Sequence, residues 1–329
     1  MKKAIMLLPS RSRGRIYAPE QIDRICGLVD LTDCAELVGD QGALRPILAD
    51  TEIIVTGWGM MTLDGEFLDA APRLRAVLYG AGSVRYFVTD EFWDRNILLT
   101  SAWASNAVPV IEYTVAAIVF GMKKCLQAAA LTREEKAFRQ PAGIKGVYGI
   151  KVGIIGAGMV GAGVLEMLKN YEVETYCHDP HLSPERAGEL GTTPMGLDEI
   201  FRTCDVVSLH AANIPATKHM IRGDHFRSMK DGAVFINTAR GRIIKEDEMV
   251  EVLREGRIFA FIDVTDPEPP VAASPLYTLP NVFLTPHLAG PQGWEVHRNA
   301  EYVIEELRRY LEGREPRYPV TRDMMEWMA

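Results

Sequence analysis

The sequence predicts a two-domain α/β protein built on open parallel sheets, and three observations lead to this fold class. The chain has 329 residues, which exceeds the size at which a single hydrophobic core usually stops growing. Short apolar runs rich in Val and Ile alternate with helix-like segments, as is typical of parallel sheets covered on both faces. This alternation becomes sharper from Lys151 onward, so we expect the second part of the chain to form a sheet of its own.

The first hundred residues predict a small open α/β domain. Its predicted strands are Lys3–Leu8, Leu37–Val38, Ile53–Thr56, Ala76–Tyr79 and Ile97–Thr100. The stretches between them, such as Pro19–Leu28 and Asp64–Ala70, have helical or loop composition. The N-terminus begins like a signal peptide, but Pro9 ends its apolar stretch early, so we expect a buried first strand.

The longest apolar region runs from Val108 to Met122 and is interrupted by Glu112. We expect it to be too short to span a bilayer and to form a buried helix. Asn106 is expected to cap that helix. No membrane partner is therefore predicted.

Six further apolar runs predict the second sheet. They are Val152–Ile155, Val173–Cys177, Val206–Leu209, Val234–Ile236, Phe259–Ile262 and Val282–Leu284. Helix-like segments such as Val160–Lys169 and Glu246–Glu255 lie between most of them. Six strands are the number in a complete dinucleotide-binding sheet, and ligands of such sheets bind beyond the carboxyl ends of the strands.

A glycine motif follows the first of these strands. Gly156, Gly158 and Gly161 have the spacing Gly-x-Gly-x-x-Gly, and Asp179 follows the next strand. We expect Gly156 to permit a tight turn, Gly158 to let the backbone approach a pyrophosphate, and Gly161 to let helix and strand pack closely. A carboxylate at Asp179 would bind the ribose hydroxyls and repel a 2′-phosphate, which favours NAD over NADP. The alternative is a glycine-rich turn in an ordinary βαβ unit.

Three ionisable residues follow later strands of the same predicted sheet: Arg240, Glu268 and His287. An arginine can hold a substrate carboxylate through paired donors, and a histidine can exchange a hydroxyl proton near neutral pH. A glutamate bonded to the far ring nitrogen fixes the tautomer and favours the imidazolium. Each residue alone could instead bridge surface carboxylates, lie in a solvated loop or cap a turn, but the combination predicts oxidation of an alcohol beside a carboxylate.

Taken together, these segments resemble the D-isomer-specific 2-hydroxyacid dehydrogenase family. The matching segments are Gly80-Ala-Gly82-Ser-Val, Asn106-Ala107 with Val110 and Glu112, Val152 to Gly161, Leu209-His210, Asn237-Thr-Ala-Arg240-Gly241, Asp263-Val, Glu268-Pro269 and Thr285-Pro-His287. The resemblance implies an NAD-dependent dehydrogenase that transfers hydride between the nicotinamide and C2 of a D-2-hydroxyacid. It also implies a homodimer that buries the helix beginning near Asn106.

The resemblance further implies a role for individual residues. Arg240, Glu268 and His287 would be catalytic, with Met159 and Val160 at the pyrophosphate and Asp179 at the adenosine ribose. The implied cofactor contacts are Gly156, Gly158, Met159, Val160, Gly161, Asp179, His210, Thr238, Ala239, Arg240, Asp263, His287, Ala289 and Gly290. The implied substrate contacts are the backbone amides of Gly80, Ala81, Gly82 and Ser83, with Asn106 close by, and Arg240 and His287.

Some positions depart from the family pattern. The sequence Ala211-Ala-Asn213-Ile stands where an apolar-Pro-Leu-Thr run is usual, and the usual Trp before the linking strand is absent, although Phe138 is nearby. The loop Gly57–Met61 lacks the basic residues of phosphoglycerate-specific relatives, which counts against that substrate. Four arginines could supply charge instead, but we interpret them as solvated loop residues: Arg11, Arg13, Arg15 and Arg85.

The predicted architecture is a Rossmann-type doubly wound parallel sheet inserted into a smaller flavodoxin-like α/β substrate domain. We expect residues 1–101 and 292–329 to bind substrate, residues 102–291 to bind NAD, and a cleft to lie between the two domains. An NAD-sensing binding protein of the corepressor type is the alternative function. Formate oxidation is disfavoured, because that branch has Gln in place of Glu268.

Composition excludes several other classes. Hydrophobic residues make up 47 % and charged residues 24 % of the chain, as in soluble globular proteins. The formal charge of −8 argues against nucleic acid as the main partner. The five scattered cysteines predict a reducing compartment, and we expect a cytoplasmic protein because no signal peptide or membrane span is predicted. No metal is expected, because Pro180 disfavours the helix that would make His178 and His181 a ligand pair.

Overall fold

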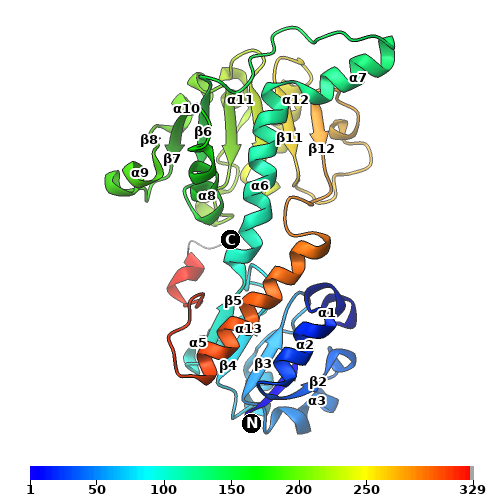
Figure 1. Cartoon of the computed structure of the whole chain (residues 1–329), viewed down its shortest axis with the longest axis vertical. Coiled ribbons are helices and arrows are strands. Elements are labelled where there is room, and N and C mark those ends of the chain that lie inside the picture. The colour runs from blue at the N-terminus through cyan, green and yellow to red at the C-terminus, as the bar shows by residue number, and fades with distance from the viewer. Residues whose placement is uncertain (327–329) are drawn as a thin grey trace. The chain divides into compact units, whose positions relative to one another are not determined.

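The computed structural model describes residues 1–326 and divides the chain into two compact units. Unit 1 comprises Met1–Ala107 and Pro291–Ala329, and unit 2 comprises Val108–Gly290. Each unit has its own parallel sheet (Figure 1). The predicted α/β class with two Rossmann-type sheets is confirmed, and helix α6 (Trp103–Met122) runs from the first unit into the second.

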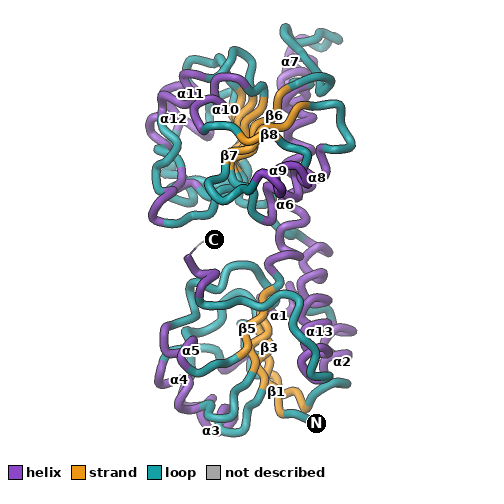
Figure 2. The backbone as a smooth tube through the Cα atoms, turned by 90° about the vertical axis from the view of Figure 1, so that its left-hand side faces the viewer, coloured by secondary structure: helices purple, strands orange, loops and turns teal. Residues whose placement is uncertain are grey.

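Unit 1 contains a five-stranded parallel sheet with helices on both faces. Its strands are β1 (Lys3–Met6), β2 (Asp30–Asp33), β3 (Ile53–Thr56), β4 (Ala76–Tyr79) and β5 (Leu98–Ser101), in the order β2-β1-β3-β4-β5. This is the flavodoxin order, in which the strand sequence reverses direction between β1 and β3. Figure 2 shows the two helical layers, α1 (Ser10–Ile16), α2 (Pro19–Cys26) and α13 (His297–Leu311) on one face, and α3 (Gln41–Leu48), α4 (Gly65–Ala70) and α5 (Asp90–Asp94) on the other.

Alternating strand residues build the two cores of unit 1. Met6 belongs to the core beneath α2 and α13, whereas its neighbour Leu7 belongs to the core beneath α3, α4 and α5. This is the period-two arrangement of a strand that is buried on both faces. Ile54 of the central strand lies between Ile5 and Val77 in the pairing register.

The strand predicted at Leu37–Val38 is wrong. Ala35–Leu37 form a single 3₁₀ turn, and the edge strand is Asp30–Asp33 instead. This strand has the polar sequence DLTD and none of its residues is buried. A solvent-exposed edge strand needs no apolar side chains, so it lacks the apolar run by which strands are recognised in a sequence.

Helix α6 corrects two further expectations. It begins at Trp103 directly after β5, where the Asn106 amide donates to the Ala102 carbonyl, so Asn106 lies in the first turn and does not cap the helix. Its 20 residues also make it long and apolar enough to cross a membrane by length and composition, the one such helix among residues 1–326. Of the most apolar 18-residue stretch of this helix, 56 % is buried within the protein. The close approach of Ile111 to Gly163 and of Gly121 to Val234 is that of a core helix.

Unit 2 contains a seven-stranded parallel sheet. Its strands are β6 (Lys151–Ile155), β7 (Glu174–His178), β8 (Thr193–Pro194), β9 (Val206–Leu209), β10 (Val234–Asn237), β11 (Phe259–Ile262) and β12 (Val282–Leu284), in the order β12-β11-β10-β9-β6-β7-β8. Counted from β6, this is the Rossmann order 3-2-1-4-5-6 with one more strand. The two-residue strand β8 was not predicted, because both of its residues are exposed.

Helices cover both faces of this sheet and bury two cores. One core contains residues of α6, α8 (Met159–Leu168) and α9 (Pro184–Leu190), and the other contains residues of α10 (Leu197–Thr203), α11 (Gly223–Ser228) and α12 (Glu246–Leu253). Helix α7 (Cys125–Glu135) has no buried residue and, with the segment that follows it, extends away from the rest of unit 2 (Figure 1).

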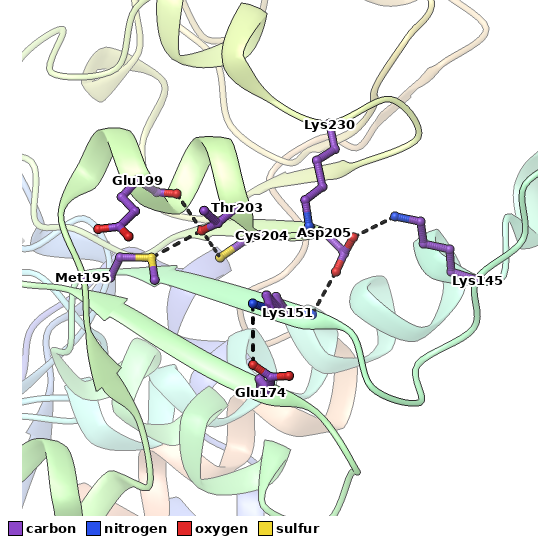
Figure 3. Close-up of polar contacts among 9 residues, drawn as sticks. All are labelled: Lys145, Lys151, Glu174, Met195, Glu199, Thr203, Cys204, Asp205 and Lys230. Carbon is purple, nitrogen blue, oxygen red and sulfur yellow. Dashed lines mark hydrogen bonds and ion pairs between the residues drawn. The ribbon is translucent and has the colours of Figure 1, made fainter.

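A buried carboxylate joins several segments at the amino ends of these strands. Asp205 precedes β9, and its Oδ1 accepts hydrogen bonds from Lys145 Nζ at 2.7 Å and Lys230 Nζ at 3.4 Å (Figure 3). Its Oδ2 accepts from the Lys151 amide at 2.9 Å. The side chain is 10 % exposed. Asp205 therefore ties the segment after α7 to the sheet.

Candidate active site

The glycine motif lies at the point where the strand order of unit 2 reverses, between β6 and β9. Gly156 has φ +94°, which favours glycine. A Cβ there would lie 2.7 Å from the Ala211 amide nitrogen in the loop after β9. The two loops thus approach each other too closely for any side chain. Gly161 is equally restricted, because its Cβ would lie 1.9 Å from the Gly156 carbonyl oxygen.

The start of α8 offers backbone donors to an anion. No atom lies within 4 Å of the position that a Cβ on Gly158 would occupy. Gly158 is the N-cap residue, and no side chain caps the helix. The first amides of the helix, at Met159 and Val160, therefore have no capping side chain, and the helix dipole favours negative charge there. These features fit the pyrophosphate of a dinucleotide.

Asp179, directly after β7, faces this turn. Its Oδ2 accepts from the Ala157 amide at 2.7 Å, and its Oδ1 accepts from the His181 amide at 2.8 Å. The carboxylate is half-buried and anchored beside the motif. Each oxygen keeps a lone pair for a further donor, so the position fits a ribose with two free hydroxyls. His181 contributes its backbone amide to this arrangement. Residues 1–326 contain no cluster of three His, Cys, Asp or Glu side chains that could hold a metal ion.

His210 is a neutral residue at the end of β9. Its Nε2 lies 2.8 Å from the hydroxyl of the buried Ser208. Burial lowers the pKa of His210 to about 3, so the ring carries no charge at physiological pH. The uncharged His210 ring therefore lies in the loop that approaches Gly156.

His287 and Glu268 form a close pair at the carboxyl ends of β11 and β12. Glu268 Oε1 lies 2.6 Å from His287 Nδ1. The two side chains remain 44 % and 41 % exposed, so the pair is open to a ligand. His287 has φ +52°, a left-handed conformation that is uncommon for a residue other than glycine. Backbone strain of this kind persists where the surrounding structure enforces it.

Asp263 enforces that conformation. It is 2 % exposed, and its Oδ1 accepts from the Thr285 hydroxyl at 2.6 Å and the Leu288 amide at 2.8 Å. Its Oδ2 accepts from the Ala289 amide at 2.9 Å. The Asp263 carbonyl also accepts from the His287 amide at 2.9 Å. The family resemblance implied that Asp263 contacts the cofactor, but it did not reveal that Asp263 holds the histidine loop.

Arg240 lies in the loop after β10. Burial lowers the pKa of Arg240, whereas the charge of the nearby Glu268 raises it, and an arginine stays protonated in either case. One guanidinium nitrogen, Nη1, donates to the Ala239 carbonyl at 2.7 Å. The buried Asn237 shapes the loop, because its Oδ1 accepts from the Ala239 amide at 3.0 Å and its Nδ2 donates to the Arg240 carbonyl at 3.3 Å.

Gly241 joins the arginine loop to the loop that carries Glu268. A Cβ on Gly241 would lie 2.0 Å from the Thr265 carbonyl carbon and 2.5 Å from the Asp266 amide nitrogen. Only glycine permits this approach of two backbones. The positioning roles of Asn237 and Gly241 were missed, although both stood in the segment that carried the family resemblance.

In unit 1, the loop after β4 is held through its carbonyl groups. The Ser101 hydroxyl lies 2.7 Å from the Ala81 oxygen and 2.6 Å from the Gly82 oxygen. The Gly80 amide donates to the Thr56 carbonyl at 2.9 Å, so this amide already has a backbone acceptor. Within residues 1–326, the amides of Ala81, Gly82 and Ser83 have no such bond. The Asn106 side chain lies 3.4 Å from the Cβ position of Gly82.

Comparison with known proteins identifies the family. Residues 115–289 match the family model of the D-isomer specific 2-hydroxyacid dehydrogenase, NAD binding domain. A D-3-phosphoglycerate dehydrogenase of Archaeoglobus fulgidus is 30 % identical over 246 residues, which cover 74 % of this chain and 46 % of the relative. A glyoxylate reductase of Korarchaeum cryptofilum is 30 % identical over 296 residues, which cover 88 % of this chain and 86 % of the relative. The chain spans about half the length of the phosphoglycerate dehydrogenases that it matches.

A solved structure agrees with the fold. The D-isomer specific 2-hydroxyacid dehydrogenase from Lactobacillus delbrueckii ssp. bulgaricus, in its NAD complexed form, has a TM-score of 0.79. The match covers 97 % of this chain and 100 % of that chain at 19 % identity, and it shows a common fold alone. The family model supplies the identity. This chain belongs to the D-isomer specific 2-hydroxyacid dehydrogenase family, and it contains that family's NAD-binding domain.

Proposed function

We propose that the protein is an NAD(H)-dependent oxidoreductase that interconverts a D-2-hydroxyacid and a 2-oxoacid. The observation that carries this proposal is the 2.6 Å pair of His287 and Glu268, with the charge of Arg240 near Glu268. A proton-exchanging group and an anion-binding group thus follow strands of the sheet that also carries the dinucleotide motif.

NAD is the cofactor that the residues fit. The motif from Gly156 to Gly161 would hold the pyrophosphate, and Asp179 would bind the adenosine ribose. Thr238, Ala239, Asp263, Ala289 and Gly290 would lie near the nicotinamide half, and His210 would also contact the cofactor. Bound NAD supplies the acceptor or donor of the hydride. Since the anchored Asp179 carboxylate would repel a 2′-phosphate, we expect a preference for NAD over NADP.

His287 exchanges the proton of the substrate hydroxyl in this proposal. Its Nδ1 is held by Glu268, so Nε2 is the nitrogen that can face the substrate. A carboxylate at this distance stabilises the imidazolium that is needed to reduce a carbonyl group, and it fixes the ring orientation. The strained loop conformation enforced by Asp263 aims the ring.

Arg240 binds the substrate carboxylate and polarises the carbonyl oxygen. A guanidinium presents paired donors that match a carboxylate. Partial burial strengthens this interaction, because fewer water molecules compete for the charge. Following the family resemblance, we assign the amides of Ala81, Gly82 and Ser83, with Asn106, to substrate binding by unit 1. Accordingly, residues 1–101 and 292–329 would bind substrate and residues 102–291 would bind NAD.

We also propose a cytoplasmic homodimer. Helix α7 and the segment after it, to residue 149, expose large apolar side chains, including Phe138 at 103 % and Tyr148 at 77 %. Exposed apolar surface of this extent marks an interaction site, and a second copy of the chain is the partner that the family resemblance implies. Size-exclusion chromatography with light scattering distinguishes a dimer from a monomer.

The five cysteines, all free, suit a reducing compartment.

An assay of NADH oxidation with a panel of 2-oxoacids tests the catalytic proposal. We expect turnover with at least one of them, and formation of the D-hydroxyacid by chiral chromatography. Tight NADH binding without turnover of any 2-oxoacid would contradict the proposal and favour an NAD-sensing binding protein. Oxidation of formate is not expected, because Glu268 carries a charge where that branch has an amide.

A further inference from the structure

The small sheet of unit 1 has its own point at which the strand order reverses. Ligands of open α/β sheets bind at the carboxyl edge where the strand order reverses, and in unit 1 this point lies between β1 and β3. Helix α1 follows β1, and the loop Gly57–Met61 follows β3. The two are tightly packed, since a Cβ on Gly57 would lie 2.3 Å from Ile16 Cδ1.

Arg15, near the end of α1, is held at this point. Its guanidinium carbon lies 4.9 Å from the centre of the Trp58 ring. Its Nη2 lies 3.2 Å from Gln292 Oε1 and 3.4 Å from the Pro291 carbonyl oxygen. Stacking on an aromatic ring orients a guanidinium and leaves its edge free to donate. No partner occurs within residues 1–326 for Nη1 and Nε of Arg15, apart from the ring.

Unlike Arg13 on the same helix, Arg15 has no ion-pair partner among residues 1–326. Arg13 forms an ion pair with Asp33. In contrast, neither Arg11 nor Arg15 has a carboxylate oxygen within 4.0 Å in the described part of the chain. Arg11 precedes Arg15 by one helical turn, so the two lie on one face of α1. These residues lie on a helix, not in a loop as we had expected.

We propose that Arg15, stacked on Trp58, binds an anionic group at the end of the substrate remote from C2. The inference rests on the proposed dehydrogenase function and specifies its substrate class, a 2-oxoacid with a second carboxylate or a phosphate. An exposed guanidinium that keeps Nη1 and Nε as donors and has no internal counter-ion among residues 1–326 binds either group through charge-assisted hydrogen bonds. Arg15 thereby takes the part that basic residues in the loop Gly57–Met61 would otherwise play.

The test compares three substrates in wild type and in Arg15→Ala. The substrates are 2-oxoglutarate, 3-phosphohydroxypyruvate and the uncharged-chain 2-oxopentanoate. We expect wild type to prefer at least one of the two anionic substrates. We call the anionic substrate with the higher kcat/KM in wild type the preferred substrate. In Arg15→Ala, the kcat/KM for the preferred substrate, divided by the kcat/KM for 2-oxopentanoate, should fall by about 10- to 100-fold, as for loss of a charge-assisted hydrogen bond. Whichever anionic substrate loses its advantage identifies the group as carboxylate or phosphate.

Two further variants separate a local contact from a general effect of charge. Arg13→Ala removes one positive charge from the same helix, and it should leave the substrate ratio unchanged, because Asp33 already neutralises Arg13. Arg15→Lys keeps the charge but loses the planar donors, so it should recover part of the preference. Melting temperatures of all variants check the fold.

The outcomes distinguish this inference from the function on which it rests. If wild type reduces 2-oxopentanoate but prefers neither anionic substrate, or if Arg15→Ala and Arg13→Ala change the ratio equally, the role of Arg15 is disproved and the dehydrogenase remains. If wild type reduces none of the three or any other 2-oxoacid, the dehydrogenase function itself fails, and the specificity assignment fails with it.

Discussion

Asp205 and Glu268 lie at opposite ends of the strands of the seven-stranded sheet. Both are carboxylates paired with a basic side chain, but Asp205 stabilises the fold whereas Glu268 is proposed to support catalysis. Asp205, at the amino edge, is 10 % exposed and accepts from two lysines and a backbone amide. Glu268, at the carboxyl edge, is 41 % exposed and is paired with one imidazole. Asp205 has its partners within the fold, whereas the Glu268 pair leaves the second ring nitrogen of His287 available.

Position in the fold explains the difference. In a parallel sheet covered by helices, the chain enters each strand at one edge and leaves it at the other, and the loops at the carboxyl edge surround the ligand. A buried ion pair needs additional hydrogen bonds to offset its loss of solvation, as Asp205 shows. An exposed pair contributes little to stability but can react. The following predictions test this contrast.

The largest effect is expected for His287→Ala. Loss of general acid–base catalysis should lower kcat by about 10²- to 10⁴-fold, while the Kd of NADH changes little. Stopped-flow or steady-state assays and fluorescence titration of NADH measure the two quantities. A variant that keeps more than about a tenth of the wild-type rate would disprove the proton-transfer role.

Glu268→Gln separates the charge at the carboxyl edge from the hydrogen bond. The amide can still contact His287 Nδ1, but it cannot stabilise the imidazolium, so kcat for carbonyl reduction should fall by about 10- to 100-fold. The melting temperature should stay within about 2 °C, because a pair this exposed contributes roughly 0–1 kcal/mol. A large loss of stability with normal kcat would assign Glu268 a structural role like that of Asp205.

Asp205→Asn should give the opposite result. It removes the charge that holds Lys145 and Lys230, and it should lower the free energy of unfolding by about 2 kcal/mol without changing kcat. Chemical denaturation and the NADH assay measure both quantities. An unchanged free energy of unfolding would show that the contacts of Asp205 with Lys145 and Lys230 (Figure 3) do not stabilise the fold.

The same carboxylate predicts a pH dependence of stability. Burial disfavours the charged form of Asp205, but the hydrogen bonds from Lys145 and the Lys151 amide outweigh it and lower the pKa below its usual range near 4. A depressed folded-state pKa contributes stability above the unfolded pKa and loses it as the pH falls through the folded value. Wild type should therefore lose stability below about pH 4 more steeply than Asp205→Asn. Equal slopes would contradict this assignment.

The smallest effect is expected for a third carboxylate, Asp179, which combines features of the other two. It is held by two backbone amides yet keeps free lone pairs. Asp179→Ser should shift the ratio of kcat/KM for NADH over NADPH toward NADPH by about tenfold, which corresponds to one repulsive charge contact. The matched control is Asp205→Asn, which removes a charge from the other edge and should not move the ratio.

Much of the fold and of the site was predictable because burial and backbone geometry restrict residue types locally. Val206–Leu209 and Phe259–Ile262 are buried strands and were found by their apolar runs. The edge strand at Asp30–Asp33 and the start of α6 at Trp103 were not found, because neither position requires an apolar or capping side chain. The anchoring bonds of Asp263 and the clash at Gly241 involve loops that are distant in sequence.

By itself, the sequence determined which residue types follow each strand, and hence the chemistry that is possible at the carboxyl ends of the strands. The reason is that buried strands and a glycine turn allow few other backbone conformations. Only the tertiary structure decided which charges are already neutralised. Within residues 1–326, Arg13 pairs with Asp33, whereas Arg15 stacks on Trp58. Asp205 pairs with two lysines, whereas Nε2 of His287 has no protein partner in this part of the chain. The physical reason is that Coulombic and hydrogen-bonding interactions act over a few ångströms in space, and distances along the chain do not reveal them.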